Sequence, residues 1–178
     1  MLYAAMLRGM NVGGHKRVAM ADLRALLSRL GFTDVVTLLQ SGNAVFHGPE
    51  ALPDELAARI ERAIVDELTM SVRCMVRTGP ELRAVIEDNP FADRATQGSR
   101  FLALFLSARP DAELLARYDP RSLAPSEVHL GDRVIYQWCP EGILAAPNVH
   151  GFVEKNLNVA VTARNWNTVT KLGTLLAA

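Results

Sequence analysis

The 178-residue sequence has few cysteines, few aromatic residues and no excess of charge of either sign. Its two cysteines, Cys74 and Cys139, form no CxxC motif and have no histidine at zinc-binding spacing, so nothing in the sequence requires a disulfide or indicates a structural zinc site. The 19 basic and 19 acidic side chains cancel. A balanced charge lacks the overall positive potential typical of proteins that bind long nucleic acids, and it leaves only a local basic patch as a basis for such binding.

Long apolar runs are also absent. No stretch approaches the roughly 20 apolar residues of a membrane-spanning helix, and the start MLYAAMLRG lacks the basic leader and the apolar core of a secretory signal. We therefore expect a cytoplasmic protein without a membrane partner. The 49% hydrophobic and 21% charged content is ordinary for a globular protein, and the length allows one sizeable core or two small halves packed together.

Hydrophobic periodicity predicts the order strand, helix, strand, strand, helix, strand in the first half. Leu23, Leu27 and Leu30 recur at helical spacing, and Pro53 suits the first turn of a second helix because its missing N–H costs no hydrogen bond there. Gly42 is expected to supply a positive φ in the turn of residues 41–43. The predicted elements are strand 2–7, helix 20–30, strands 35–40 and 44–47, a helix from residue 53, and strand 71–77.

The second half repeats that order without repeating the residues. The predicted elements are a short helix at 81–88, a polar linker at 92–99, strand 101–107, helix 111–118, a hairpin at 126–139, helix 149–157, strand 158–163 and a final helix from about 165. We therefore predict an α+β fold of two tandem ferredoxin-like subdomains packed as one unit. The subdomains are residues 1–78 and 101–163, joined by a helix and linker at 79–100 and followed by a C-terminal helix at 164–178.

The predicted topology brings separate polar segments to one rim. In a βαββαβ sheet the first and third strands are antiparallel neighbours, so Arg8, at the end of the first strand, lies beside the start of the third strand. The turn Ser41-Gly42-Asn43 belongs to that start, and the glycine-rich segment GMNVGGHKR leaves from the same rim. This convergence predicts a polar site.

The segment TARNWNT, residues 162–168, has two interpretations. In the structural one, Asn165 or Thr162 caps the last helix and Trp166 fills the interface between the halves. In the functional one, the free N–H groups of the helix start attract an anion, and Arg164 holds a phosphate or carboxylate bidentately. The two interpretations are compatible.

Known catalytic motifs fit poorly. Gly9 and Gly14 have the separation of a P-loop, but His15 and Lys16 stand where a lysine and a magnesium-binding hydroxyl are needed. No GxSxG motif occurs, the four histidines are far apart and without a carboxylate motif, and no pair of acids suggests general acid and base. Catalytic residues are therefore unassigned, and we expect no metal and no cofactor.

Several segments together resemble a known family. LRGMNVGGHKRVAM, LLQSGNAVF, NPF and TARNWNTVTKL occur in an order and spacing similar to those of the bacterial proteins grouped as domain-of-unknown-function family 1697. The resemblance implies two ferredoxin-like subdomains and no established activity, and it carries over no catalytic residues. The positions that match the family pattern are Arg8, Gly9, Asn11, Gly13, Gly14, Ser41, Gly42, Asn43, Asn89, Pro90, Arg164, Asn165, Trp166 and Asn167.

Three hypotheses about function follow. The leading one is a binding protein for an anionic ligand, either a nucleotide, a phosphorylated metabolite or a short nucleic acid. The alternatives are a structural or protein-interaction module without a small-molecule ligand, and an enzyme of unassigned reaction with His15 as the candidate base. The sequence names no protein partner. The residues predicted to bind the anion are Arg8, Asn11, Gly13, Gly14, Lys16, Ser41 and Asn43, with Arg164, Asn165 and Asn167 as further contributors.

Overall fold

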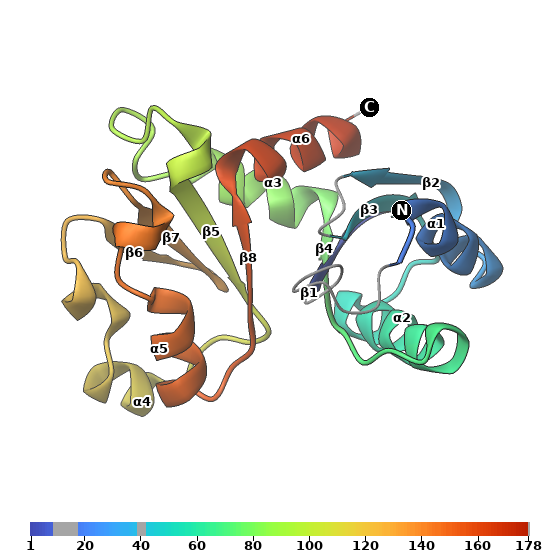
Figure 1. Cartoon of the computed structure of the whole chain (residues 1–178), viewed down its shortest axis with the longest axis horizontal. Coiled ribbons are helices and arrows are strands. Elements are labelled where there is room, and N and C mark those ends of the chain that lie inside the picture. The colour runs from blue at the N-terminus through green and yellow to red at the C-terminus, as the bar shows by residue number, and fades with distance from the viewer. Residues whose placement is uncertain (9–17, 39–41, 178) are drawn as a thin grey trace. The chain divides into compact units, whose positions relative to one another are not determined.

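The computed structural model describes all residues except 9–17, 39–41 and 178. The chain divides into two compact units, one formed by Met1–Arg83 with Leu172–Ala178 and the other by Ala84–Lys171 (Figure 1). The unit boundaries fall inside two helices, α3 (Gly79–Glu87) and α6 (Trp166–Ala177). We describe each unit by itself.

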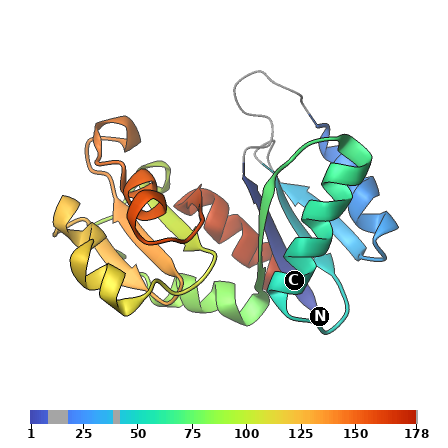
Figure 2. The same ribbon diagram turned by 90° about the horizontal axis from the view of Figure 1, so that it is seen from below.

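The first unit has the element order βαββαβ. Its elements are β1 (Leu2–Arg8), α1 (Met20–Arg29), β2 (Thr33–Leu38), β3 (Asn43–His47), α2 (Pro53–Leu68) and β4 (Arg73–Thr78). The strands form an antiparallel sheet in the order β2-β3-β1-β4. Both α1 and α2 lie on the same face of this sheet (Figure 2). Alternate strand residues such as Leu7, Phe46 and Cys74 pack with Leu23 and Ile60 of these helices to form the core of the unit.

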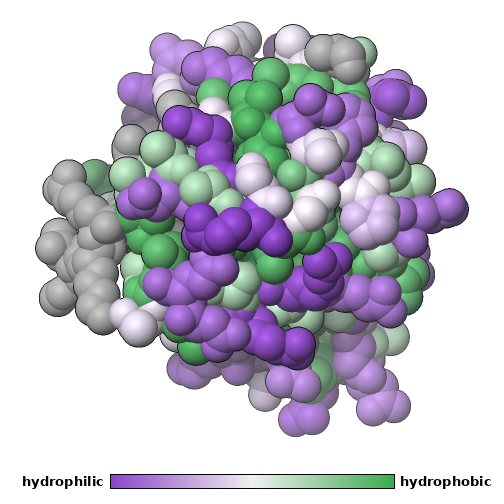
Figure 3. Space-filling model, turned by 90° about the vertical axis from the view of Figure 1, so that its right-hand side faces the viewer, coloured by the Kyte–Doolittle hydropathy of each residue, from purple (hydrophilic) through white to green (hydrophobic). Residues whose placement is uncertain are grey.

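Local sequence explains how these elements begin and end. The helix α2 starts at Pro53, with Asp54 and Glu55 in the first turn, where negative charge is favoured by the helix dipole. The turn between β2 and β3 contains Gly42 at φ +93°, a left-handed conformation that favours glycine, as predicted. Hydrophilic side chains predominate on the side of the first unit seen in Figure 3, with smaller apolar areas between them.

The second unit repeats the order with additional 3₁₀ turns. Its elements are η1 (Gly98–Arg100), β5 (Phe101–Leu106), α4 (Ala112–Arg117), η2 (Pro120–Leu123), β6 (Val128–Gly131), β7 (Val134–Trp138), η3 (Ile143–Ala145), α5 (Val149–Asn156) and β8 (Val161–Asn165). The antiparallel sheet has the order β6-β7-β5-β8. Leu104, Ile135 and Val161 of the strands pack with Val149 and Val153 of α5 in a second core.

The other face of this sheet carries an aromatic cluster. The Phe101 ring lies 4.7 Å from the Trp166 ring and 5.9 Å from the Phe91 ring, measured between centroids. The Tyr136 hydroxyl donates to the carbonyl oxygen of Val85 over 2.6 Å. Burial, together with the nearby negative charge of Asp88, raises the pKa of Tyr136 to about 12. The cluster therefore fixes the start of α6 and the end of α3 against the second sheet.

The predicted fold class is confirmed: the protein is α+β with two four-stranded antiparallel sheets and a C-terminal helix. Some bounds differ. The strand predicted at 158–163 is β8 at Val161–Asn165, so Arg164 and Asn165 are strand residues and the last helix begins at Trp166. Within the described residues no helix is long and apolar enough to cross a membrane. Cys74 and Cys139 are buried free thiols.

Candidate ligand-binding sites

Two arginines face each other at the edge of the first sheet where β1 ends. Arg8, the last residue of β1, is paired with Arg73, the first residue of β4. Their neighbours Leu7 and Cys74 belong to the core beneath α1 and α2. Because strand side chains alternate between the two faces, Arg8 and Arg73 project from the opposite face of the sheet. We call Arg8, Arg73 and the adjoining Gly42-Asn43 the arginine edge.

The third strand meets this edge as the topology predicted. The Leu7 N–H donates to the Gly42 carbonyl oxygen over 2.8 Å, and Met6 is paired with Asn43. Asn43 is completely buried, and its Nδ2 donates to the carbonyl oxygen of Leu38 over 2.9 Å. That hydrogen bond ties the end of β2 to the start of β3. Asn43 therefore stabilises the turn between β2 and β3, whether or not a ligand binds at the arginine edge.

The other residues predicted for this rim are not described. Asn11, Gly13, Gly14, Lys16 and Ser41 lie outside the described residues, as does His15. Within the described residues, the arginine edge is formed by β1, β3 and β4.

Arg164, Asn165 and Asn167 belong to the second unit. The Asn165 Oδ1 accepts hydrogen bonds from the Thr168 N–H at 3.0 Å and the Thr168 hydroxyl at 3.1 Å, so Asn165 rather than Thr162 caps α6. The Thr162 hydroxyl is buried without a hydrogen-bond partner among the described residues. Arg164 donates from Nη1 to the Ala163 carbonyl oxygen over 2.9 Å, and Asn167 is exposed in the first turn of α6.

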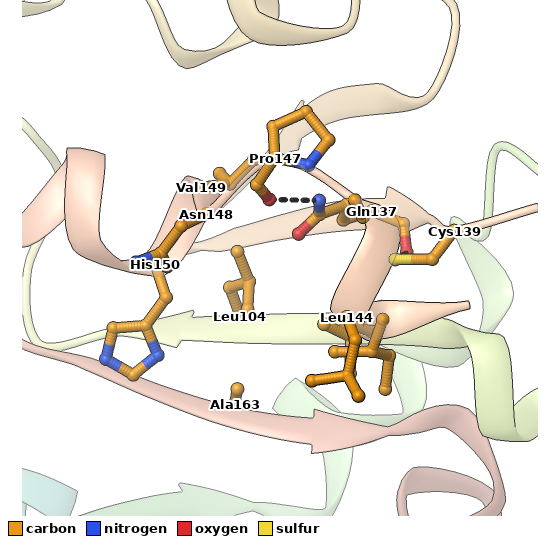
Figure 4. A pocket seen from close by; sticks show the side chains of 12 residues that line it. Leu104, Gln137, Cys139, Leu144, Pro147, Asn148, Val149, His150 and Ala163 are labelled. Atoms are coloured by element: carbon orange, nitrogen blue, oxygen red, sulfur yellow. Dashed lines mark hydrogen bonds between the residues drawn. The ribbon is translucent and has the colours of Figure 1, made fainter. Parts of the chain in front are cut away.

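A pocket of about 400 Å³ opens in the second unit (Figure 4). Its volume lies within the range of small-molecule sites. Strands β5, β7 and β8 provide one wall, and the segment 143–150, which contains η3 and the start of α5, provides the other. The lining residues, which we call the apolar pocket, are Leu102, Leu104, Gln137, Cys139, Ile143, Leu144, Ala146, Pro147, Asn148, Val149, His150 and Ala163.

Two polar side chains of the apolar pocket have defined partners. Gln137 is only 3% exposed, and its Nε2 donates to the Pro147 carbonyl oxygen over 2.9 Å, which leaves its Oε1 directed into the pocket (Figure 4). The Nε2 of His150 lies 3.0 Å from Oε1 of Glu154. The other carboxylate oxygen of Glu154 accepts from the Val161 N–H over 3.3 Å. The Nδ1 edge of the His150 ring is on the pocket side (Figure 4).

The sequence has no carboxylate motif around its histidines, but two single pairs were missed: His47 Nδ1 lies 3.1 Å from Asp34, and His150 Nε2 lies 3.0 Å from Glu154. Glu154 follows His150 four residues later on α5, where the two side chains lie on the same face of the helix. The i,i+4 spacing of His150 and Glu154 could have indicated this pair from the sequence. Gln137 could also have been noticed, because it is a polar residue within the apolar strand β7.

The Cys139 thiol lines the apolar pocket but is not set up as a nucleophile. It is completely buried, and burial together with the negative charge of Glu127 raises its pKa, which favours the unreactive thiol over the thiolate. Among the described residues there is no group of three or more His, Cys, Asp or Glu side chains that would hold a metal ion. The pocket therefore offers apolar contact and hydrogen-bond acceptors.

The fold and these sites define a class of α+β protein with two βαββαβ units, a cationic sheet edge in the first and an apolar pocket in the second. The chain belongs to the family described as "Protein of unknown function (DUF1697)", which matches residues 1–136 and confirms the resemblance seen in the sequence. The structure is similar to that of the conserved bacterial protein SP0830 from Streptococcus pneumoniae, with a TM-score of 0.67 and 22% identity over 98% of each chain. That similarity shows the fold. No curated protein matches the chain.

Proposed function

We propose that this protein binds an anionic ligand at the arginine edge of the first unit. The ligand class is a nucleotide, a phosphorylated metabolite or a short nucleic acid. The observation that supports the proposal is the direct cross-strand pairing of Arg8 with Arg73 on one face of the sheet.

A bound anion offsets the repulsion between two like charges that face each other across neighbouring strands. Directly opposite residues of an antiparallel pair lie about 5 Å apart at Cβ, and like charges in that position destabilise a sheet. The guanidinium groups stand at the ends of long side chains, so an anion that bridges them gains from both charges whatever the Cβ spacing. A guanidinium does not escape by deprotonation, because its pKa is too high.

An anion held between the two guanidinium groups reverses the sign of this interaction. Each guanidinium presents a planar set of donors that matches two oxygens of a phosphate or carboxylate. Residues 9–17 follow Arg8 directly in the sequence and contain His15, Lys16 and Arg17, which bring further donors and positive charge. Asn11, Gly13, Gly14 and Ser41 stay in the proposed site on sequence grounds.

Some of the predicted site residues have structural contacts that explain them without a ligand. Asn43 and Asn165 each satisfy a neighbouring backbone group, which accounts for them without a ligand. Arg164 and Asn167 belong to the second unit, so they are left out of the site proposed for the first unit. Arg8 and Arg73 therefore carry the proposal.

The test compares charge-matched variants. Nucleotides and short oligonucleotides are titrated against wild type, Arg8→Ala, Arg73→Ala and Arg62→Ala, which removes the same charge from an exposed position of α2. A ligand at about a hundred times its Kd stabilises the folded state by about 2.7 kcal/mol, which a thermal shift resolves. We expect binding by wild type and Arg62→Ala, weaker binding by the other two, and a decline with added salt.

The competing function is a structural or protein-interaction module, which the contacts of Asn43 and Asn165 favour for those two residues. Under that function no anion stabilises the wild type, and Arg8→Ala and Arg73→Ala behave like Arg62→Ala. Either result contradicts the proposed function.

A further inference from the structure

We propose that the apolar pocket of the second unit binds a small, uncharged and mainly apolar molecule that carries one hydrogen-bond donor, a hydroxyl or a ring N–H. This site is independent of the arginine edge, because its lining residues all belong to the second unit.

The apolar side chains that line the pocket are the reason to expect a mainly apolar ligand. Leu102, Leu104 and Ala163 contribute from the sheet, and Ile143 and Leu144 contribute from η3. Ile143 is 44% exposed and Leu144 is fully exposed, so the apolar surface of the pocket continues onto its rim. Contact with an apolar molecule removes this surface from water, which favours binding.

Gln137 is the reason to expect a hydrogen-bond donor on the ligand. The residue is 3% exposed, and the small accessible part includes Oε1 at the pocket, where a ligand donor can replace water. The Nε2 is satisfied by the Pro147 carbonyl oxygen, whereas Oε1 points into the pocket and accepts no hydrogen bond from the described residues (Figure 4). A hydroxyl or N–H of a bound molecule fits this acceptor. An ether or ester oxygen in that position does not.

His150 adds a second acceptor. The Glu154 carboxylate only accepts hydrogen bonds, so its contact with Nε2 of His150 places the ring proton on that nitrogen. In the neutral ring the other nitrogen, Nδ1, is then an acceptor on the pocket side. Asn148 turns its Oδ1 to the Gly151 N–H at the start of α5. Asn148 keeps its Nδ2 as a donor, so the selection for a ligand donor rests on Gln137 Oε1 and His150 Nδ1.

The size of the pocket selects a small molecule rather than a protein segment. About 400 Å³ accommodates one or two rings, and the lining comes from three strands and one short segment. Indole and phenol have the stated chemistry. Their methylated forms, 1-methylindole and anisole, keep the ring and lose the donor.

The experiment measures the affinity of these four probes for the full-length protein by calorimetry and by amide chemical shifts. We expect indole and phenol to bind and the methylated forms to bind about tenfold more weakly. The amide shifts are expected at Gln137, Leu144 and His150. Gln137→Met, which keeps the side-chain length and removes one of the two acceptors, is expected to reduce the preference for the donor.

Two variants fill the pocket from opposite walls. Ala163→Leu acts from β8 and Ala146→Leu from the segment after η3, so failure of one to fold leaves the other as a test. Ala112→Leu, at an exposed position of α4, makes the same substitution outside the pocket. We expect the filled variants to lose binding at least tenfold and Ala112→Leu to keep it. Arg8→Ala is also expected to keep it, which separates this site from the anion site.

Three outcomes overturn the proposal. They are the absence of indole and phenol binding at millimolar concentration, equal binding of the methylated and parent probes, and undiminished binding by both filled variants. A dimer that Leu144→Ser disrupts, in a protein that binds neither probe, assigns the apolar rim to a second copy of the chain instead.

Discussion

A Cβ atom placed on Gly98 would lie 2.1 Å from Oδ1 of Asn167, the second residue of α6. Such a distance is far inside the separation at which nonbonded atoms pack. An alanine at position 98 therefore forces the Asn167 side chain to turn away, and no positive φ favours glycine there. The contact gives Asn167, which the sequence suggested as a ligand-binding residue, a place in the packing of the second unit.

Gly98→Ala is therefore expected to destabilise the protein by about 1 kcal/mol, the low end of the cost of overpacking, because the exposed Asn167 side chain can turn aside. Adding Asn167→Ala removes the clashing side chain and restores most of the loss, although the Asn167 backbone nitrogen at 3.2 Å leaves a residual cost. Urea denaturation of the two single variants and the double variant measures this coupling. Gly79→Ala is the matched control, because a Cβ there meets nothing within 4 Å. Additive effects at 98 and 167 would refute the explanation.

Asn43→Ala is expected to lower the free energy of unfolding by about 1 to 3 kcal/mol, because the Leu38 carbonyl oxygen loses its donor at a buried position. Asn43→Asp keeps the shape and also removes the donor, so it is expected to be at least as harmful. Chemical denaturation gives both values. If both variants are as stable as wild type, the hydrogen bond to Leu38 is not what holds the turn.

Asn165→Ala is expected to cost about 1 kcal/mol, because α6 loses its N-cap. Asn165→Asp and Asn165→Ser retain a capping oxygen and are expected to stay near wild type. Thr162→Val serves as the control, since the Thr162 hydroxyl has no hydrogen-bond partner among the described residues and its replacement by a methyl group is expected to be neutral or stabilising. Thermal melts compare the four variants. Equal destabilisation by Asn165→Ala and Asn165→Asp would argue against capping.

Stability is expected to fall between pH 10 and 12 on account of Tyr136. Its folded-state pKa of about 12 exceeds the unfolded value near 10, so in this interval the folded state holds a proton that the unfolded state releases. The stabilisation is complete below pH 10 and is lost as pH rises, amounting to about 2 to 3 kcal/mol for a difference of about two pKa units.

Tyr136→Phe isolates this contribution from the other groups that titrate at alkaline pH. The variant loses the hydrogen bond to Val85 and is expected to be less stable than wild type at pH 8 by about 1 kcal/mol. The gap should close near pH 11 and reverse by pH 12, because wild type alone then loses about 2 kcal/mol. Parallel stability curves for the two proteins would show that the Tyr136 hydroxyl titrates normally in the folded state.

The sequence predicted that the end of the first strand and the start of the third strand meet at the arginine edge. Arg8 and the Gly42 turn could be placed together because hydrophobic alternation located both strands and the topology made them neighbours. Arg73 was not predicted as a site residue. Its position depends on the register between β1 and β4, and a shift of one residue would have turned it to the other face of the sheet.

The apolar pocket is a different case. One of its walls is the segment 143–148, which contains only a single 3₁₀ turn and so gives no periodic signal. A cavity also depends on how side chains from separate strands fail to fill the space between them, which composition and spacing do not encode. Only two sequence features indicated the apolar pocket: the polar Gln137 in an apolar strand and the spacing of His150 and Glu154.

The hydrogen bond from Gln137 to Pro147 has a mechanical consequence. The carboxamide is conjugated, so a donor that binds its oxygen draws electrons from its nitrogen and strengthens the N–H donation to the Pro147 carbonyl oxygen. Pro147 belongs to the wall of the pocket, and Gln137 belongs to the central strand pair β5 and β7. Filling the pocket therefore strengthens the hydrogen bond that holds its wall to the sheet, and we expect proteolysis of the segment 143–148 to slow as the pocket fills.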